Sequence, residues 1–194
     1  MTEASRSVGV LLAAGRGRRF GADKRLHAMA DGAPMAVAAA SQLLKVCAVV
    51  VAVVRPEDDE LAARLQAVGC RICACPNADL GMGHSLAAGV TATPDAAGWL
   101  IALGDMPHIR PDSYRQVIAA LHAGASIARP SYQGTPGHPV GFASAWFAQL
   151  STLTGDAGAR EIVRQAGKLC LSCPVNEPGV IADIDRPEDL QAQA

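Results

Sequence analysis

Strand-like apolar runs alternate with helix-like segments along most of the chain, and this alternation constrains the fold more than any other feature. Residues 7–14, 46–54 and 98–105 are rich in valine, leucine, isoleucine and alanine along their whole length. Strands that are apolar on both faces are typical of a parallel sheet covered by helices on both sides. The sequence therefore predicts an α/β fold, a single Rossmann-like domain over residues 1–194 with a mostly parallel sheet.

Each expected element has its own local signal. The expected strands are 7–14, 46–54, 70–76, 98–105 and 125–130, with a short strand within 168–175 and a strand-like run at 179–185. The expected helices are 33–45, 56–69, 83–92, 110–124 and 156–167. Residues 132–144 are rich in glycine and proline, which predicts a hairpin or an irregular loop.

Composition excludes several classes of protein. Half of the residues are apolar (50%) but only 4% are aromatic, which favours alanine-rich helices packed on an aliphatic sheet. A formal net charge of -1 argues against bulk binding of nucleic acid or an anionic membrane. No apolar run approaches the roughly 20 residues of a membrane span, and the N-terminus is not typical of a signal peptide. We therefore expect a cytoplasmic protein without a membrane or nucleic-acid partner.

Two C-x-x-C pairs, Cys70 with Cys73 and Cys170 with Cys173, raise the question of a zinc site. Both pairs fall in expected short strands, where residues three apart point to opposite faces. One strand would therefore not present both thiolates to one metal. Buried, reduced cysteines are the interpretation that we favour over zinc.

The segment "LLAAGRGRRFGADK" (11–24) follows the first expected strand and would lie at the carboxyl edge of the sheet, where ligands bind. It is neither a dinucleotide fingerprint nor a P-loop, because Phe20 stands where both patterns require glycine. The N–H groups of Gly15 and Gly17 could enclose a polyphosphate together with the basic side chains of the loop. Those side chains are Arg16, Arg18, Arg19 and Lys24. The alternative is a solvated basic turn.

Three acids are candidate metal ligands. Asp105 ends a buried strand, where a carboxylate points into the ligand crevice and Mg²⁺ finds an oxygen ligand. If 179–185 is a strand, alternation places Asp183 and Asp185 on one face. Each acid also has a structural alternative, Asp105 as a turn residue before Pro107 and Asp185 as the cap of a last helix.

Further polar residues have two interpretations each. Ser85 and nearby helix N-terminal amides could hold a base or ribose, or Ser85 could belong to a capped helix start. His138 could line an acceptor pocket or be structural. Asp156 is expected to cap the helix 156–167, which leaves Arg160 facing an anionic acceptor or solvent.

Six motifs in order carry a family resemblance. They are "LLAAGRGRRFGADK" (11–24), "GMGHSLAAGV" (81–90), "ALGDMP" (102–107), "GHPVGF" (137–142), "GDAGAR" (155–160) and "DIDRPEDL" (183–190). Together they resemble the molybdenum cofactor cytidylyltransferases, within the guanylyltransferase-like nucleotidyltransferase family of molybdenum cofactor enzymes. The resemblance spans nearly the whole chain and implies a fold of the nucleotide-diphospho-sugar transferase type.

The resemblance implies Mg²⁺-dependent transfer of CMP from CTP to molybdenum-loaded molybdopterin, with release of pyrophosphate. The implied catalytic residues are Arg19, Lys24 and Asp105, and the implied metal ligands are Asp105 and Asp185, with Asp183 as a third candidate. The implied nucleotide-binding residues are Leu12, Ala13, Ala14, Gly15, Gly17, Arg19, Lys24, Gly83 and Ser85. The implied acceptor-binding residues are His138 and Arg160. In this family, LAAG accompanies cytidine transfer and LAGG guanosine transfer.

Two alternatives remain open at this point. One is a nucleotidyltransferase that acts on another phosphorylated acceptor, such as a sugar phosphate. The other is a non-catalytic chaperone that binds a nucleotide or cofactor for a molybdenum hydroxylase. The expected partners are CTP and molybdopterin, with transient contact to a molybdenum hydroxylase or its chaperone.

Overall fold

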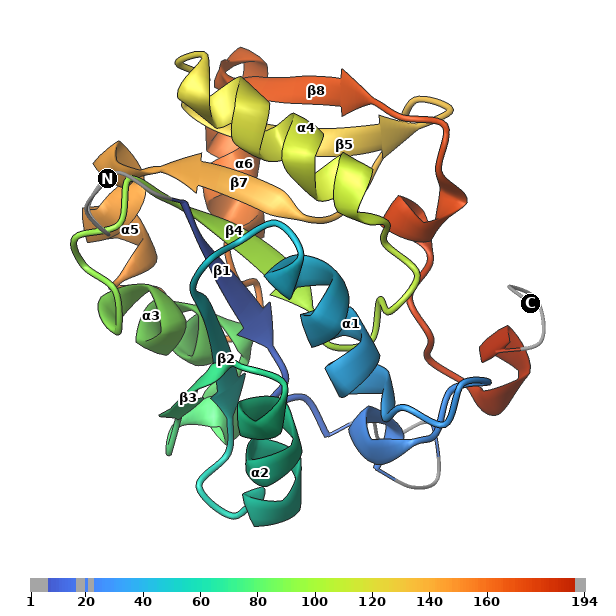
Figure 1. Ribbon diagram of the computed structural model, residues 1–194. Coiled ribbons are helices and arrows are strands. Elements are labelled where there is room, and N and C mark those ends of the chain that lie inside the picture. The colour runs from blue at the N-terminus through green and yellow to red at the C-terminus, as the bar shows by residue number, and fades with distance from the viewer. Residues whose placement is uncertain (1–6, 17–19, 21–22, 191–194) are drawn as a thin grey trace.

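A mixed sheet forms the centre of the computed structural model, which describes residues 7–16, 20 and 23–190 (Figure 1). The strands are β1 (Ser7–Leu12), β2 (Val50–Val54), β3 (Arg71–Ala74), β4 (Gly98–Leu103), β5 (Ile127–Tyr132), β6 (Thr135–Pro136), β7 (Val140–Ala143) and β8 (Cys170–Pro174). Their order is β3-β2-β1-β4-β7-β5-β6, and β8 pairs with β5. The predicted α/β fold with a mostly parallel sheet is confirmed.

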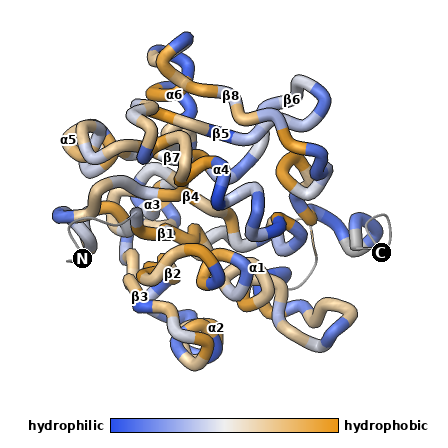
Figure 2. The backbone as a smooth tube through the Cα atoms, turned by 45° about the horizontal axis from the view of Figure 1, so that its top comes forward, coloured by the Kyte–Doolittle hydropathy of each residue, from blue (hydrophilic) through white to orange (hydrophobic). Residues whose placement is uncertain are grey.

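The central strands are parallel because helices carry the chain back between them. β1 pairs in parallel with β2 and β4, and β2 pairs in parallel with β3. Every residue of β1 and β2 is buried, as the unbroken apolar runs predict. Figure 2 shows the hydrophobic colour concentrated along β1 and β2 in the middle of the molecule.

Helices cover both faces of the sheet. One face carries α1 (Met35–Leu44), α2 (Asp59–Ala67) and α4 (Pro111–His122), and the other α3 (Met82–Thr91), α5 (Phe147–Leu150) and α6 (Arg160–Ala166). Successive strand residues point to opposite faces of the sheet and belong to two hydrophobic cores, so Leu11 packs on the α1 side and Val10 on the α3 side. No helix of the described residues is long and apolar enough to cross a membrane.

The glycine- and proline-rich segment 132–144 contains a strand that the sequence pattern did not predict. β5 and β6 form the expected hairpin, whose turn residues Gln133 and Gly134 both have positive φ (49° and 81°). The chain then returns as β7, which lies antiparallel between β4 and β5. This insertion is what makes the sheet mixed.

The prediction of a strand at residues 179–185 is wrong. Residues Pro178–Ile181 form a short 3₁₀ helix, and residues 182–186 belong to no strand. Hydrogen bonds outside any ladder hold the segment in place: His138 N donates to Val180 O (2.7 Å), and Ile184 N donates to Asp105 O (3.0 Å). The face-sharing argument for Asp183 and Asp185 therefore loses its basis.

The cysteines are free, as the favoured interpretation expected, but of the two C-x-x-C pairs only Cys70 is buried, and Cys73, Cys170 and Cys173 are partly exposed. All six are free, and Cys47, Cys70 and Cys75 are buried. Burial raises the pKa of the Cys47 thiol to about 12 and that of Cys70 to about 11, so both stay protonated at neutral pH. Among the residues that the structure describes, no cluster of three His, Cys, Asp or Glu side chains is placed to hold a metal ion.

Candidate active site

Three neighbouring parallel strands end at one edge of the sheet, and the segments that follow them build the candidate site. In the ladder, Leu12 of β1 pairs with Val53 of β2 and with Leu103 of β4. The glycine loop after β1 therefore starts beside the chain that leads to Arg55 and beside the chain that leads to Asp105. The carboxyl edge of an α/β sheet is where ligands bind.

The glycine loop leaves open space at this edge. Ala14 is buried, with 4% of its surface exposed, whereas Gly15 is exposed. A Cβ atom built on Gly15 would meet nothing within 4 Å, and the φ angle of this residue is not positive. Neither packing nor backbone conformation therefore requires glycine here, and open space lies beside the residue. Gly17, Arg18 and Arg19 lie outside the described residues, and their phosphate contacts stay predictions.

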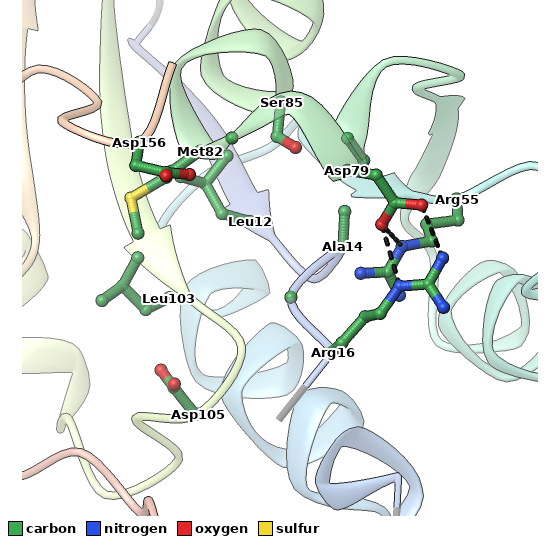
Figure 3. A pocket seen from close by; sticks show the side chains of 13 residues that line it. Leu12, Ala14, Arg16, Arg55, Asp79, Met82, Ser85, Leu103, Asp105 and Asp156 are labelled. Atoms are coloured by element: carbon green, nitrogen blue, oxygen red, sulfur yellow. Dashed lines mark hydrogen bonds and ion pairs between the residues drawn. The ribbon is translucent and has the colours of Figure 1, made fainter. Parts of the chain in front are cut away.

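A cavity of about 370 Å³ lies against the loop (Figure 3). Leu12, Ala14 and Gly15 line it from the loop side, Ser85 from α3 and Asp105 from the end of β4. The size is that of a small-molecule site. The structure thus brings together four of the predicted nucleotide-binding residues and the predicted metal ligand Asp105.

Two other predicted nucleotide-binding residues use their backbone N–H groups within the protein. The N–H of Ala13 donates to Val53 O (2.9 Å), and that of Gly83 donates to Gly155 O (2.8 Å). A Cβ atom on Gly83 would lie 2.5 Å from Thr154 O, so glycine is required there for packing. Neither residue lines the cavity.

The backbone of residues 81–83 ("GMG") packs against the backbone of residues 154–156 ("TGD"). Gly81 has a φ of 125°, and a Cβ atom there would lie 2.3 Å from the carbonyl of Gly155. Asp156, the next residue, lines the cavity and lies beside Met82 (Figure 3). The predicted capping role of Asp156 is wrong, because α6 begins at Arg160 and its N-cap Ala159 has no side-chain cap. Sequence reasoning had no signal for the cavity position of Asp156.

Arg16 and Arg55 converge on Asp79 in the same cavity (Figure 3). Arg16 donates to both oxygens of Asp79, at 2.8 and 2.5 Å, and Nε of the buried Arg55 lies 3.3 Å from Asp79 Oδ1. The Arg16 guanidinium beside Asp79 lowers the pKa of that carboxyl. Sequence analysis identified Arg16 but neither Arg55 nor Asp79, since each follows a strand without any motif.

Lys24 joins the two predicted metal ligands. Its Nζ donates to Asp105 Oδ2 (2.8 Å), Ile184 O (2.9 Å) and Asp185 Oδ1 (2.9 Å). These bonds use all three N–H groups of the ammonium. Burial alone would lower the pKa of Lys24, but Asp105 and Asp185 raise it above its ordinary value. The sequence predicted a phosphate contact for Lys24; the structure places it, buried, between two carboxylates.

The oxygens of this cluster suit a hard divalent cation. Oδ1 of Asp105 is buried, and no described residue hydrogen-bonds to it. Mg²⁺ is commonly held by one or two carboxylates plus substrate phosphates and water, so Asp105 and Asp185 fit as its protein ligands. Asp183 lines a second cavity together with Asp105, but no group of three His, Cys, Asp or Glu side chains is placed to hold a metal ion among the described residues.

A second network of charged residues, centred on Arg25, holds the start of the glycine loop in place. The sequence did not predict this network. The buried Arg25 donates to Asp23 (2.8 and 2.6 Å), to Asp58 Oδ1 (2.7 Å) and to Ala13 O (2.8 Å). Asp58 also accepts from the N–H of Arg55 (3.0 Å). Burial opposes the charge of Arg25, but Asp23 and Asp58 raise its pKa. Arg25 therefore ties the loop to the start of α2.

A second cavity, of about 620 Å³, adjoins the first. It lies on the α6 side of the sheet and contains the two predicted acceptor-binding residues, His138 and Arg160. Arg129 of β5 also lines it. Its walls are otherwise largely apolar, with Ile101, Val140, Phe142 and Val163 among them.

We expect His138 to make the stability of the fold pH-dependent. Burial, with a smaller contribution from Arg129, lowers its pKa from 6.5 to about 4, against the opposing effects of Asp105 and a backbone hydrogen bond to Ile101. Between these two values the unfolded chain binds a proton that the folded protein does not. This contribution to stability is therefore present above pH 6.5 and is lost as the pH falls towards 4, at about 1.4 kcal/mol per pKa unit.

Urea unfolding at pH 7 and pH 5 measures this effect. His138→Gln should flatten the difference in unfolding free energy between the two pH values. The exposed His122 of α4 offers a matched control, and His122→Gln should leave the difference as in the wild type. Equal pH dependence in the wild type and His138→Gln would show that His138 is not the group responsible.

A ligand-sized cavity lies against the glycine loop at the carboxyl ends of parallel strands, and Asp105 of its lining is joined through Lys24 to Asp185. The chain belongs to the family described as the MobA-like NTP transferase domain, whose model matches residues 9–169. Nucleotidyl transfer is therefore its reaction class.

The proteins similar to this chain carry different names. Nicotine blue oxidoreductase of Paenarthrobacter nicotinovorans is 30% identical over 190 residues, covering 94% of this chain and 93% of that protein. The purine catabolism protein PucB of Bacillus subtilis (strain 168) is 33% identical over 119 residues, 59% of this chain and 57% of PucB. Rv0371c of Mycobacterium tuberculosis H37Rv has a TM-score of 0.84 at 24% identity, with 98% of each chain covered. A manganese complex of Rv0371c has a TM-score of 0.79 at 23% identity, with 97% of each chain covered.

Proposed function

We propose that this protein transfers CMP from CTP to the terminal phosphate of molybdenum-loaded molybdopterin and releases pyrophosphate, with Mg²⁺ as the cation. The observation that carries the proposal is the junction of two cavities at one carboxylate. Asp105, Leu12, Met82 and Leu103 line both cavities. A group transfer needs its donor and its acceptor on either side of the reacting atom, and this junction provides that arrangement.

The residues of the first cavity have distinct tasks towards the donor. Ala14 and Ser85 border the space for the base and ribose, and Arg16 and Arg55 supply positive charge for the triphosphate. The acceptor phosphate is already ionised at neutral pH, so its oxygen attacks the α-phosphorus without a general base. The bond from the α-phosphorus to the bridging oxygen breaks, and pyrophosphate leaves with that electron pair.

Asp105 and Asp185 would hold the cation beside the reacting phosphate, and Lys24 fixes the separation of their carboxylates. A divalent cation bound there neutralises charge on the α-phosphate and on the departing pyrophosphate. The manganese complex of the structurally similar Rv0371c supports a divalent cation in this fold. The choice of Mg²⁺ is part of the proposal.

The direct test is pyrophosphate release by the purified protein with CTP, Mg²⁺ and molybdenum-loaded molybdopterin. Parallel reactions with sugar phosphates test the alternative acceptors. We expect release with molybdopterin that exceeds release with any sugar phosphate. Release with a sugar phosphate alone would move the function to that acceptor, and no release with any acceptor would overturn nucleotidyl transfer.

The similarity to nicotine blue oxidoreductase raises a second candidate, a role attached to a redox enzyme. In that case the protein would bind nucleotide or cofactor and hand it to a molybdenum hydroxylase without catalysis. Tight binding of molybdopterin with no turnover of CTP would favour this role over transfer. The Lys24–Asp105–Asp185 cluster favours transfer, because a carrier has no need for a cation site beside the phosphates.

Ala14 should set the choice of base. Its methyl group lies in the wall of the first cavity, with 4% of its surface exposed, and would narrow the slot for the base. A purine would clash where cytosine fits, so CTP should be preferred over GTP. Ala14→Gly should relax this preference by about tenfold, the effect of one or two methyl-sized contacts in a pocket. Pyrophosphate release with CTP and GTP at matched concentrations measures the ratio.

Ala13→Gly is the matched control for this prediction. Ala13 is as buried as Ala14, with 2% of its surface exposed, but it does not line the cavity. The substitution should lower stability without changing the ratio of the two nucleotides. A wild-type preference for GTP or ATP would reject cytidylyl transfer and leave the fold and the carboxylate cluster unaffected.

A further inference from the structure

Arg129 is a half-buried cation for which the described residues provide no ion-pair partner. It lies in β5, where alternation places its side chain on the same face as Ile127, which packs on the α6 side of the sheet. There it lines the second cavity. Its Nε atom is buried, and among the described residues no acid forms an ion pair with it and nothing hydrogen-bonds to Nε.

Arg25 shows what this protein does with a buried arginine that has only a structural task. The carboxylates of Asp23 and Asp58 both accept hydrogen bonds from its guanidinium, and the carbonyl oxygen of Ala13 accepts a further one. The groups near Arg129 are instead Cys170 and His138, which carry no negative charge in this environment. Burial lowers the pKa of Arg129, which reflects the cost of keeping it charged without a partner.

The rest of the cavity indicates the chemistry of the missing partner. Arg160, the first residue of α6, also lines the cavity, and the described residues provide it with no ion pair. Apolar side chains such as Ile101, Phe142 and Val163 form much of the wall, and Asp105 and Asp183 also line the cavity. A ligand with an apolar body and an oxyanion would satisfy both the surface and the charges.

We propose that Arg129 binds an oxyanionic group of the acceptor, a phosphate or a carboxylate, and with Arg160 makes the second cavity selective for anionic acceptors. This inference rests on the proposed function, because it takes the second cavity as the acceptor site. The planar guanidinium of Arg129 carries donors in a fork, which matches two oxygens of one anionic group. The cost of the unpaired charge in the free protein is recovered when the acceptor binds.

Binding of inorganic phosphate to the purified protein tests the inference without any nucleotide or turnover. We expect phosphate to raise the melting temperature of the wild type and to bind at least about tenfold more weakly to Arg129→Met, because a charged hydrogen-bond partner is lost. Acetate and sulfate in parallel arms distinguish a carboxylate site from a phosphate site. Arg115→Met is the matched control, since Arg115 is an exposed arginine of α4 paired with Asp112.

A second readout separates binding from a structural role. If the task of Arg129 is to bind an anion, Arg129→Met removes an unpaired, half-buried charge and should raise the melting temperature of the free protein. A structural arginine would give a lower melting temperature. Arg129→Lys, which keeps the charge but not the fork, should retain weak binding and provides a folded variant if the methionine variant aggregates.

These binding measurements test the role of Arg129 independently of the reaction that the protein catalyses. Phosphate affinity of Arg129→Met within twofold of the wild type would overturn the inference, as would a wild type that does not bind phosphate, sulfate or acetate. Phosphate that binds only in the first cavity would lose affinity in Arg16→Met and not in Arg129→Met, which also overturns it. Failure of the proposed function would instead appear as absent pyrophosphate release with phosphate binding at Arg129 intact.

Discussion

Asp105→Asn should reduce nucleotidyl transfer by about 10³-fold or more while the protein stays folded. The amide keeps the size of the carboxyl and can still accept from Lys24 Nζ, which lies 2.8 Å from Oδ2 in the wild type. It removes the charge at Oδ1, the buried oxygen that has no partner among the described residues. Losing one preorganised electrostatic contact in a catalytic site costs about 10²–10³-fold, and here a cation ligand is lost as well.

The measurement is the rate of pyrophosphate release at saturating CTP over a series of Mg²⁺ concentrations. Asp185→Asn should give a loss of the same kind, because Asp185 is the other carboxylate on Lys24. Asp112→Asn, at an exposed acid of α4, is the control and should be as active as the wild type. Activity of Asp105→Asn within tenfold of the wild type would remove Asp105 from the reaction, whereas unfolding by circular dichroism would require the test to be repeated with Asp105→Glu.

The parts of this molecule that could be predicted from sequence are those with local signals. Alternation of buried strands and helices gives the parallel core, because burial on both faces leaves an uninterrupted apolar run in β1 and β2. Asp105 was found for a similar reason, since it follows such a run at the edge where ligands bind. The loop at Ala14 and Gly15 was found by composition, and the cavity against it agrees with that expectation.

The parts that sequence could not predict are contacts between distant segments. Lys24 meets Asp105 across 81 positions and Asp185 across 161, and no periodicity reports a pairing over such a separation. Nothing local marks Arg129 as unpaired or Arg25 as fully paired, because the difference lies in which acids the fold brings near. The run at 179–185 failed because its backbone bonds to His138 and Asp105 individually instead of joining a ladder.

Lys24→Met should lower kcat by about 10²-fold or more. It should not raise the KM for CTP, as the loss of a phosphate contact would. The wild-type ammonium holds Asp105 and Asp185 at 2.8 and 2.9 Å and has no N–H left for a ligand. Without it, two carboxylates face each other with Ile184 O unpaired, and removing one partner from this partly buried ionic cluster lowers the stability of the fold. The cation then binds to displaced ligands, so the loss falls on the chemical step.

Three measurements on Lys24→Met distinguish positioning from direct binding. We expect kcat to fall with little change in the KM for CTP. Without nucleotide, Mn²⁺ should bind the variant at least as tightly as it binds the wild type. Urea unfolding should show a lower free energy of unfolding. Tighter Mn²⁺ binding follows because a competing positive charge has left the carboxylates. Lys45→Met, at an exposed lysine of α1's C-terminal end, is the control. A raised KM for CTP with unchanged kcat would instead mean that Lys24 leaves the carboxylates to bind the triphosphate, because uniform binding loss appears in KM alone.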